Sequence, residues 1–399
     1  MGEWKQCTIA DLGMVITGKT PSTKITELWD GTVHFVTPKD IQGLKHITNT
    51  ERRITDAGLQ KVKGSALPPR AVCVSCIGNI GYTGMTTQKC VTNQQINSII
   101  VNSDNDPDFV YYLMRYLWPF FKNYEGQSTT LSILNKTQFS KISVTVPDKA
   151  TQKRIAEVLS ALDEKIAANA RINDNLQQQL CAIFMERFTN NPALESIQQV
   201  PLSELCSVVT KGTTPTTLGK PFVDRGINFL KAESILDNHS LDKGKFAHID
   251  EETHDMLKRS VIYAGDIVFT IAGTLGRFAL IDSDILPANT NQAVAIIRAD
   301  KGRISPEYLY ACFIGNWHND YYSKRVQQAV QANLSLTTIK SLPIPVLTQD
   351  EMVSYMALIS PIIRMLKQNE MENERLAALR DTLLPRLMSG EVDVSNIDA

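Results

Sequence analysis

The chain has 399 residues, which is too long for one simple core and predicts two or more domains. Its 43% apolar and 21% charged content is that of a soluble globular protein, and no stretch approaches the roughly 18 consecutive apolar residues of a membrane span. The formal net charge of −1 is mild evidence against a nucleic-acid binder, and seven scattered cysteines predict reduced thiols and a cytoplasmic location.

The charge is unevenly divided along the chain. Residues 1–147 carry 15 basic and 11 acidic residues, a net charge of +4, whereas residues 348–399 carry 5 basic and 9 acidic residues, a net charge of −4. Only the first globular segment is basic, and its excess is modest.

The first segment has short apolar runs separated by polar turns, which is the pattern of buried strands. Strands are predicted at 33–36 and at 71–77, and the second ends in the turn Gly78-Asn79-Ile80-Gly81. Thr92-Asn93-Gln94 opens another apolar strand. Asp106-Pro107 combines an N-cap with a first-turn proline and predicts the start of a helix.

A long amphipathic helix is predicted over 148–188, with Asp148 as its N-cap. Its apolar residues alternate at spacings of four and three, which is the heptad seam of a coiled coil. The seam consists of Ile155, Leu159, Leu162, Ile166, Asn169, Asn173, Leu176, Leu180 and Ile183. Two asparagines thus occupy seam positions where apolar residues are expected.

The second half of the chain repeats this order and indicates a duplicated unit. Its equivalents are a strand at 227–230, a strand at 266–272 that ends in Gly273-Thr274-Leu275-Gly276, the segment Thr290-Asn291-Gln292 and a helix start at Ser305-Pro306. A second long helix matches the first at an offset of 200 residues, including Asn369 and Asn373, with one exception: Arg380 is the equivalent of Leu180.

The ends of the second long helix also carry signals. Thr348 and Glu351 have the spacing of a capping box, and Gly390 suits a C-terminal turn. Pro385 is expected to kink or end the regular helix. The acidic tail after Gly390 is expected to be a loose extension or an edge strand.

These elements predict an α+β fold with two tandem β-rich α/β domains, joined by two long antiparallel coiled-coil helices in a pseudo-twofold repeat. The expected divisions are a first domain at 1–147, a central helix at 148–188, a linker at 189–199, a second domain at 200–347, a C-terminal helix at 348–390 and a tail at 391–399.

Two patterns that mimic reactive sites are better explained structurally. Cys73-x-x-Cys76 has the spacing of a zinc or redox pair, but the internal copy has Val268 and Ile271 at these places, so core cysteines are expected and no metal. Asp148 with Asp163-Glu164-Lys165 matches a nuclease-like string only if the spacing is chosen freely. A solvated helix face is expected instead.

Other residues are candidates for DNA contact, each beside a structural alternative. The Gly-x-x-Gly turns could let backbone amides approach a phosphate, yet as tight turns they need no ligand. Amide side chains can bond an adenine edge and lysines can neutralise phosphates, although the amides could also cap a strand entrance. The candidates are Lys19, Thr20, Lys39, Asn79, Asn93, Gln94, Lys211, Thr213, Lys231, Thr274, Arg277, Asn291 and Gln292.

The sequence lacks familiar catalytic motifs. It has no Asn/Asp-Pro-Pro-aromatic tetrapeptide of the methyltransferase kind, no phosphate loop of a helicase and no convincing Ser/His/Asp arrangement. We therefore expect a binding protein without chemistry of its own and with no cofactor bound by this chain.

Two similar globular domains that alternate with two long helices, closed by Leu383-Leu384-Pro385-Arg386-Leu387-Met388-Ser389-Gly390-Glu391, resemble the specificity subunits of type I restriction-modification systems. The resemblance covers the whole chain and also includes the Thr-Pro-Ser/Thr turns after Gly18 and Gly212. It implies that each domain is a target recognition domain that reads one half of a split double-stranded DNA sequence, with the helices as a spacer.

The resemblance also implies partners. Two modification subunits would flank this chain and supply S-adenosylmethionine and adenine methylation, and restriction subunits would add translocation and cleavage driven by ATP with Mg²⁺. Recognition is expected to need distorted DNA or an extruded base. The alternatives are a coiled-coil scaffold without a DNA role and a single-chain enzyme.

Helix geometry supports the spacer. About 40 helical residues at ~1.5 Å each span roughly 60 Å, enough to hold two domains one DNA turn of ~34 to 36 Å apart. In an antiparallel pair with its axis at 171 and 371, Asn169 faces Asn373 and Asn173 faces Asn369. These contacts are predicted to fix register at some cost in stability; the alternative is a seam that opens to solvent there.

Overall fold

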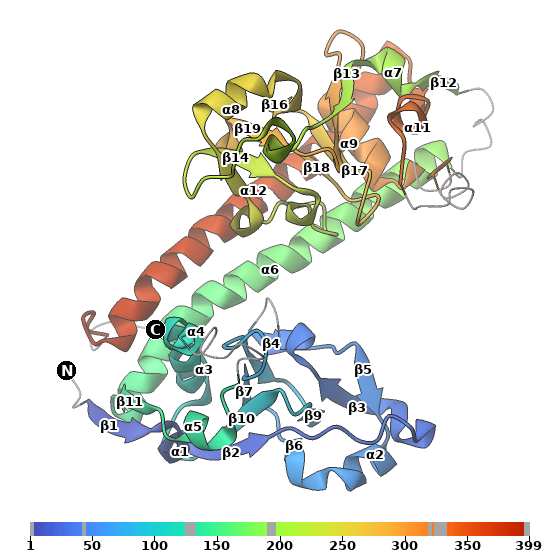
Figure 1. The fold of residues 1–399 in the computed structure, drawn as a ribbon. Coiled ribbons are helices and arrows are strands. Elements are labelled where there is room, and N and C mark those ends of the chain that lie inside the picture. Colours follow the sequence, from blue (N-terminus) through green and yellow to red (C-terminus); the bar gives the residue numbers. More distant parts are fainter. Residues whose placement is uncertain are drawn as a thin grey trace. The chain divides into compact units, whose positions relative to one another are not determined.

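The computed structural model describes residues 4–41, 45–123, 133–189, 197–317, 321–322 and 333–394 (Figure 1). The chain divides into two compact units. The first comprises Met1–Asn169 with Glu372–Ala399, and the second comprises Ala170–Met371. Each unit therefore combines one globular domain with a part of both long helices.

The first unit is built on three antiparallel or mixed sheets, in the strand orders β1-β11, β2-β10-β7-β8-β4 and β5-β3-β9-β6. Its strands are β1 (Lys5–Thr8), β2 (Gly13–Thr17), β3 (Trp29–Val36), β4 (His46–Ile47), β5 (Arg52–Ile54), β6 (Ala66–Leu67), β7 (Val72–Ser75), β8 (Thr83–Thr86), β9 (Cys90–Thr92), β10 (Ile96–Val101) and β11 (Ser143–Val146). Its short helices are α1 (Ile9–Leu12), α2 (Asp56–Lys61), α3 (Pro107–Tyr116), α4 (Trp118–Lys122) and α5 (Lys136–Ser140).

The second unit repeats this plan with the strand orders β12-β21, β13-β20-β17-β18 and β15-β14-β19-β16. Its strands are β12 (Gln198–Pro201), β13 (Cys206–Lys211), β14 (Ile227–Leu230), β15 (Ala247–Ile249), β16 (Val261–Ile262), β17 (Ile267–Thr270), β18 (Phe278–Leu280), β19 (Ala288–Thr290), β20 (Val294–Ala299) and β21 (Pro343–Val346). Its short helices are α7 (Leu202–Leu205), α8 (Glu251–Met256), α9 (Pro306–Ile314) and α11 (Leu336–Lys340).

The central strand of each larger sheet is buried on both faces. In β7 the side chains of Val72 and Val74 enter one core, whereas Cys73 enters another. In β17 the same alternation sends Phe269 and Val268 to different cores. Because neighbouring residues of a strand point to opposite faces, two-sided burial explains why these strands read as continuous apolar runs.

The long helices are α6 (Lys149–Phe188) and α12 (Gln349–Met388). Asp148 accepts bonds from the Ala150 and Thr151 amides, which confirms it as an N-cap. Glu351 accepts bonds from the backbone and hydroxyl of Thr348, as the capping-box spacing predicted. None of the helices in the described residues is long and apolar enough to cross a membrane.

Three expectations about the helices need correction. Pro385 was expected to kink or end its helix, and the second alternative is wrong, because α12 continues past it to Met388. The tail is not loose at Val394, which is 3% exposed and belongs to the core of the first unit. Asp163 does not lie on a solvated face, because its side chain is 11% exposed and paired with Arg380.

Candidate nucleic-acid interface

Three turns meet at one end of the larger sheet in the first unit. Strand β10 pairs with β2 at Asn97–Thr17 and with β7 at Ile96–Ser75, both antiparallel. The start of β10 therefore lies beside the ends of β2 and β7. This brings together the turn after β2, the Gly-x-x-Gly turn after β7 and the Thr-Asn-Gln segment before β10, which lie far apart in the sequence.

Gly18 lets the backbone of the turn after β2 pack directly against the Thr-Asn-Gln segment. A Cβ atom at this position would lie 2.1 Å from the Asn93 carbonyl oxygen, so only glycine allows the approach. Two residues later, the Thr20 hydroxyl donates to Oε1 of Gln94 at 2.6 Å. This bond fixes the orientation of the exposed Gln94 amide and leaves its Nε2 hydrogens to donate elsewhere.

The second unit has the same arrangement. A Cβ atom on Gly212 would lie 2.0 Å from the Thr290 carbonyl oxygen, and the Thr214 hydroxyl donates to Oε1 of Gln292. The predicted Thr213 instead accepts a bond from Arg259 at 3.2 Å. Thr214 could have been chosen from the sequence, because it precedes Pro215 as Thr20 precedes Pro21.

The two asparagines of these segments form turns. Asn93 is 9% exposed, and its amide both accepts from the Gln95 backbone and donates to the Gln95 side chain. Asn291 accepts from the backbone of Ala293 at 3.2 Å. Both hold the backbone before the next strand, which favours the structural alternative for Asn93 and Asn291. Gln94 and Gln292 are the exposed amides.

A hydroxyl group closes each Gly-x-x-Gly turn. Ser75 donates to the carbonyl oxygen of Asn79 at 2.5 Å, and Thr270 donates to that of Thr274 at 2.5 Å. The first and last glycine of each turn have positive φ angles, between 77° and 97°, which glycine adopts without strain. The side chains of Asn79 and Thr274 remain exposed at the tips of these turns.

The basic candidates differ in their exposure to solvent and in the groups that they already contact. Lys19, Lys39 and Lys211 are exposed, and Lys39 lies 3.9 Å from Glu51. Lys231 lies over the ring of Phe222, with Nζ 4.9 Å from its centroid.

Arg277 is held within its own domain. Its Nε and Nη2 atoms donate to the carboxylate of Asp237 at 2.6 and 2.7 Å, and Nη1 donates to the Ile235 carbonyl oxygen. The charge of Arg277 is therefore already balanced by an acid, unlike that of Lys211.

Cys73 and Cys76 are both buried in cores of the first unit, as the prediction of core cysteines required. Burial raises the pKa of each thiol to about 12, and the two side chains enter different cores. A metal ion needs deprotonated thiolates that converge on one point. Within the described residues, no three histidine, cysteine or acidic side chains gather as a metal site would require.

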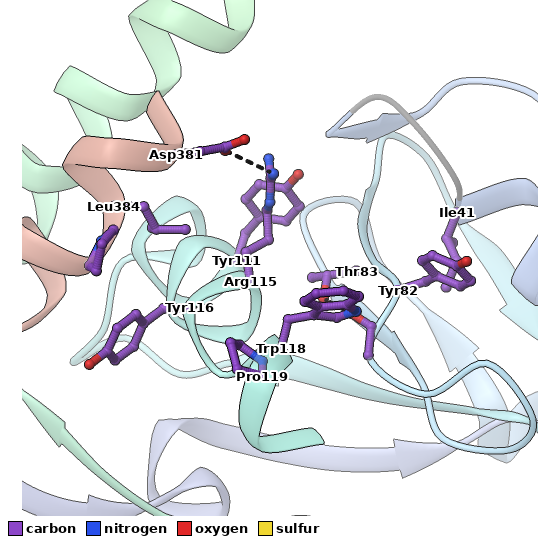
Figure 2. A pocket seen from close by; sticks show the side chains of 12 residues that line it. Ile41, Tyr82, Thr83, Tyr111, Arg115, Tyr116, Trp118, Pro119, Asp381 and Leu384 are labelled. Atoms are coloured by element: carbon purple, nitrogen blue, oxygen red, sulfur yellow. Dashed lines mark hydrogen bonds and ion pairs between the residues drawn. The ribbon is translucent and has the colours of Figure 1, made fainter. Parts of the chain in front are cut away.

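A cavity of about 540 Å³ in the first unit was not predicted from the sequence (Figure 2). Tyr82 and Trp118 line one side, and Arg115 of α3 points toward Asp381 of α12, at 3.6 Å (Figure 2). A Cβ atom on Gly81 would lie 2.6 Å from the Trp118 ring, so the second glycine of the turn is also required by packing. The aromatic residues between Tyr116 and Phe121, to which no role was assigned from the sequence, are the signal that could have indicated this cavity.

The seam asparagines contact each other as predicted. Asn169 donates to Oδ1 of Asn373 at 2.9 Å, and Asn369 donates to Oδ1 of Asn173 at 2.8 Å. Asn169 is 1% exposed, so the alternative of a seam opening to solvent is wrong there. Buried amides that bond in pairs can specify register in a coiled coil.

Comparison with known proteins places this arrangement in a family. The model of the type I restriction modification DNA specificity domain matches residues 1–178 and again residues 195–374. The chain is 24% identical over 417 residues to the type I restriction enzyme MjaIX specificity subunit of Methanocaldococcus jannaschii, covering 99% of this chain and 95% of that protein. It is 30% identical over 177 residues to the HindI specificity subunit of Haemophilus influenzae, covering 44% of this chain and 39% of that protein.

The fold is also similar to a solved structure. The S subunit of a type I restriction-modification system from M. genitalium matches with a TM-score of 0.54 and 16% sequence identity, over 97% of this chain and 96% of that one. At this identity the match shows a shared fold. The two tandem family matches agree with the internal repeat seen in the sequence.

Proposed function

Because the chain belongs to the family of type I restriction modification DNA specificity subunits, we propose that each domain reads half of a bipartite target through the turns at one end of its larger sheet. The observation that supports this choice is the repeated constellation of Gly18, Thr20 and Gln94 in one unit and Gly212, Thr214 and Gln292 in the other. A surface built twice in this way suits a ligand with two similar halves, as duplex DNA provides.

The shared residues contact the DNA backbone in this proposal. Every half-site presents the same phosphates whatever its bases are. The oriented amides of Gln94 and Gln292 offer N–H donors, and the exposed Lys19 and Lys211 offer positive charge. Phosphate oxygens accept both. Sequence is then read by residues that differ between the copies, such as Asn79 and Thr274 at the turn tips.

The catalytic groups belong to partners. Two modification subunits dock along α6 and α12 and carry S-adenosylmethionine for adenine methylation, and restriction subunits bring ATP, Mg²⁺ and cleavage. The target base is extruded into the modification subunit's site. The two helices set the length of the unread spacer between the half-sites.

Binding measurements on the complex reconstituted with its modification subunits test the interface. Lys211→Gln is expected to weaken binding to target and unrelated DNA alike and to lower the slope of log K against log salt by about 1. Lys301→Gln is the matched control, because this exposed lysine follows the opposite end of the sheet strand β20. Equal effects of both substitutions would contradict the assigned surface.

A genome-wide map of methylated adenines tests the function as a whole. Deletion of this gene is expected to abolish methylation at one two-part motif. A scaffold without a DNA role predicts an unchanged map and no salt-dependent DNA binding by the complex. Methyl transfer by the purified chain alone would instead support the single-chain enzyme.

A further inference from the structure

Arg380, the one exception in the repeated seam, forms an ion pair with Asp163 of α6. In the first unit Nη1 of Arg380 donates to Oδ1 of Asp163 at 2.7 Å. The residues 200 positions away are Ile363 and Leu180, which are 4% and 0% exposed in one core of the second unit. Equivalent places of the duplicated helices therefore hold a charged pair in one unit and an apolar pair in the other.

The charged pair is well removed from solvent. The side chains of Asp163 and Arg380 are 11% and 14% exposed. Tyr112 also donates to Asp163 at 2.7 Å, and Arg380 donates to Asp381 at 2.9 Å. Burial by itself lowers the pKa of Arg380, but its bonds to Asp381 and Asp163 raise that pKa above the ordinary value, so the guanidinium stays charged.

A duplicated chain has a competing arrangement, in which α6 pairs with α6 of a second copy and α12 pairs with α12. The asparagines do not oppose it, because Asn169 of one α6 would meet Asn173 of the other. The ion pair does oppose it. Asp163 would meet Leu180 and lose Arg380, while Arg380 in the other helix pair would meet Ile363. Each self-paired helix pair contains such a mismatch twice, once at either end.

We propose that Asp163 and Arg380 make the seam of α6 select α12 of its own chain and reject α6 of a second copy. The asparagines set the register of the helices, and the asymmetric ion pair sets the identity of the partner. Without each other, Asp163 keeps as ionic partner among the described residues only Arg115, at 4.0 Å, and Arg380 keeps only Asp381, whose side chain is 56% exposed. Separating the two largely buried charges is therefore more unfavourable than the loss of an exposed pair. The proposal concerns helix pairing and is independent of DNA reading.

The test replaces the ion pair of the first unit by the apolar residues found at the equivalent positions of the second unit. The full-length Asp163→Ile/Arg380→Leu variant is unfolded in guanidinium, refolded over a range of concentrations and measured by sedimentation velocity. Wild type is expected to refold as a monomer. The variant is expected to form a dimer whose dissociation constant is lower than that of wild type by at least about tenfold, because two buried charges no longer oppose self-pairing.

The control is Lys153→Gln/Glu157→Gln, which removes an exposed ion pair of 3.5 Å on α6, away from the seam, and should stay monomeric. Circular dichroism establishes that each variant has refolded. If the apolar variant does not refold, Asp163→Asn/Arg380→Gln, which removes both charges and keeps both side chains polar, is assessed in the same way. Refolded variants that stay monomeric at every concentration, or a wild type that dimerises equally well, would overturn the proposal.

Discussion

Gly18 and Gly212 show how single residues create the candidate interface. Two residues after each glycine, a threonine bonds a glutamine from a distant turn, and neither glycine leaves room for a Cβ atom against that turn. The glycine turns and the Thr-Asn-Gln segments could both be recognised in the sequence. Whether they contact each other depends on which strands are neighbours in the sheet. The same reasoning separates Asn93, whose amide is used in its own turn, from Gln94, whose amide is exposed.

Gly18→Ala is expected to destabilise the first unit by about 1–3 kcal/mol, because the new methyl group meets backbone atoms of Thr92 and Asn93 that cannot move aside. Chemical denaturation measures the loss. Gly64→Ala is the control, since no atom lies within 4 Å of a Cβ atom at that position. Equal stability of the two variants would contradict the close approach.

His239 predicts how stability responds to acid. Burial lowers the pKa of this histidine from 6.5 to about 4, although Asp237 and a bond to the Phe278 backbone oppose the shift. The ring stacks on Phe278 at 3.9 Å. The pKa of His239 is lower in the folded chain than in the unfolded chain, so the unfolded chain takes up the proton first as the pH falls. The contribution of His239 to stability is therefore full above pH 6.5 and is lost as the pH falls toward 4.

The contribution of this histidine is at most about 3 kcal/mol across that window. Denaturation curves between pH 7 and pH 4.5 should show it. His239→Asn is expected to give a flatter dependence, since asparagine does not titrate and tolerates the φ angle of 65°. An unchanged pH dependence in the variant would rule out this histidine as the cause.

At the scale of elements, the last turns of α12 belong to the core of the first domain. Leu384, Leu387 and Met388 are buried with residues of α1, β2 and α3. The heptad pattern identified the helix but assigned its whole length to a spacer. Non-local packing gives its end a second role, because the apolar side chains near Pro385 complete a core built from the beginning of the chain.

Leu387→Ala is expected to cost about 2–5 kcal/mol and to lower hydrogen-exchange protection in the first unit while sparing the second. The residue is 1% exposed, so its truncation leaves a cavity. Leu379→Ala removes the same atoms from a site that is 47% exposed on the same helix and should cost little. Loss of protection spread over both units would contradict the division of the chain.

The whole molecule combines two units that each use both long helices. In the proposed function these helices act as the spacer between half-sites. Inserting seven helical residues after Asn169 and seven after Met371 keeps the heptad register and lengthens each helix by ~10.5 Å, about three base pairs of DNA.

We expect the double insertion to leave both half-sites unchanged and to lengthen the unread spacer by about three base pairs, as read from the methylation map. An insertion in α6 alone displaces Asn169 from Asn373 and should abolish methylation. A double insertion that methylates the original motif would show that the helices do not set the spacing.

The sequence by itself determined the duplication, the α+β class, both long helices with their caps, and the asparagine pairs. These features are local or periodic, and an offset of 200 residues made the register of the seam explicit. The tertiary structure decided which turns meet at the sheet end, which amides are exposed, and that Asp163 pairs with Arg380. Strand order and helix pairing bring distant residues together, and no local pattern records those contacts.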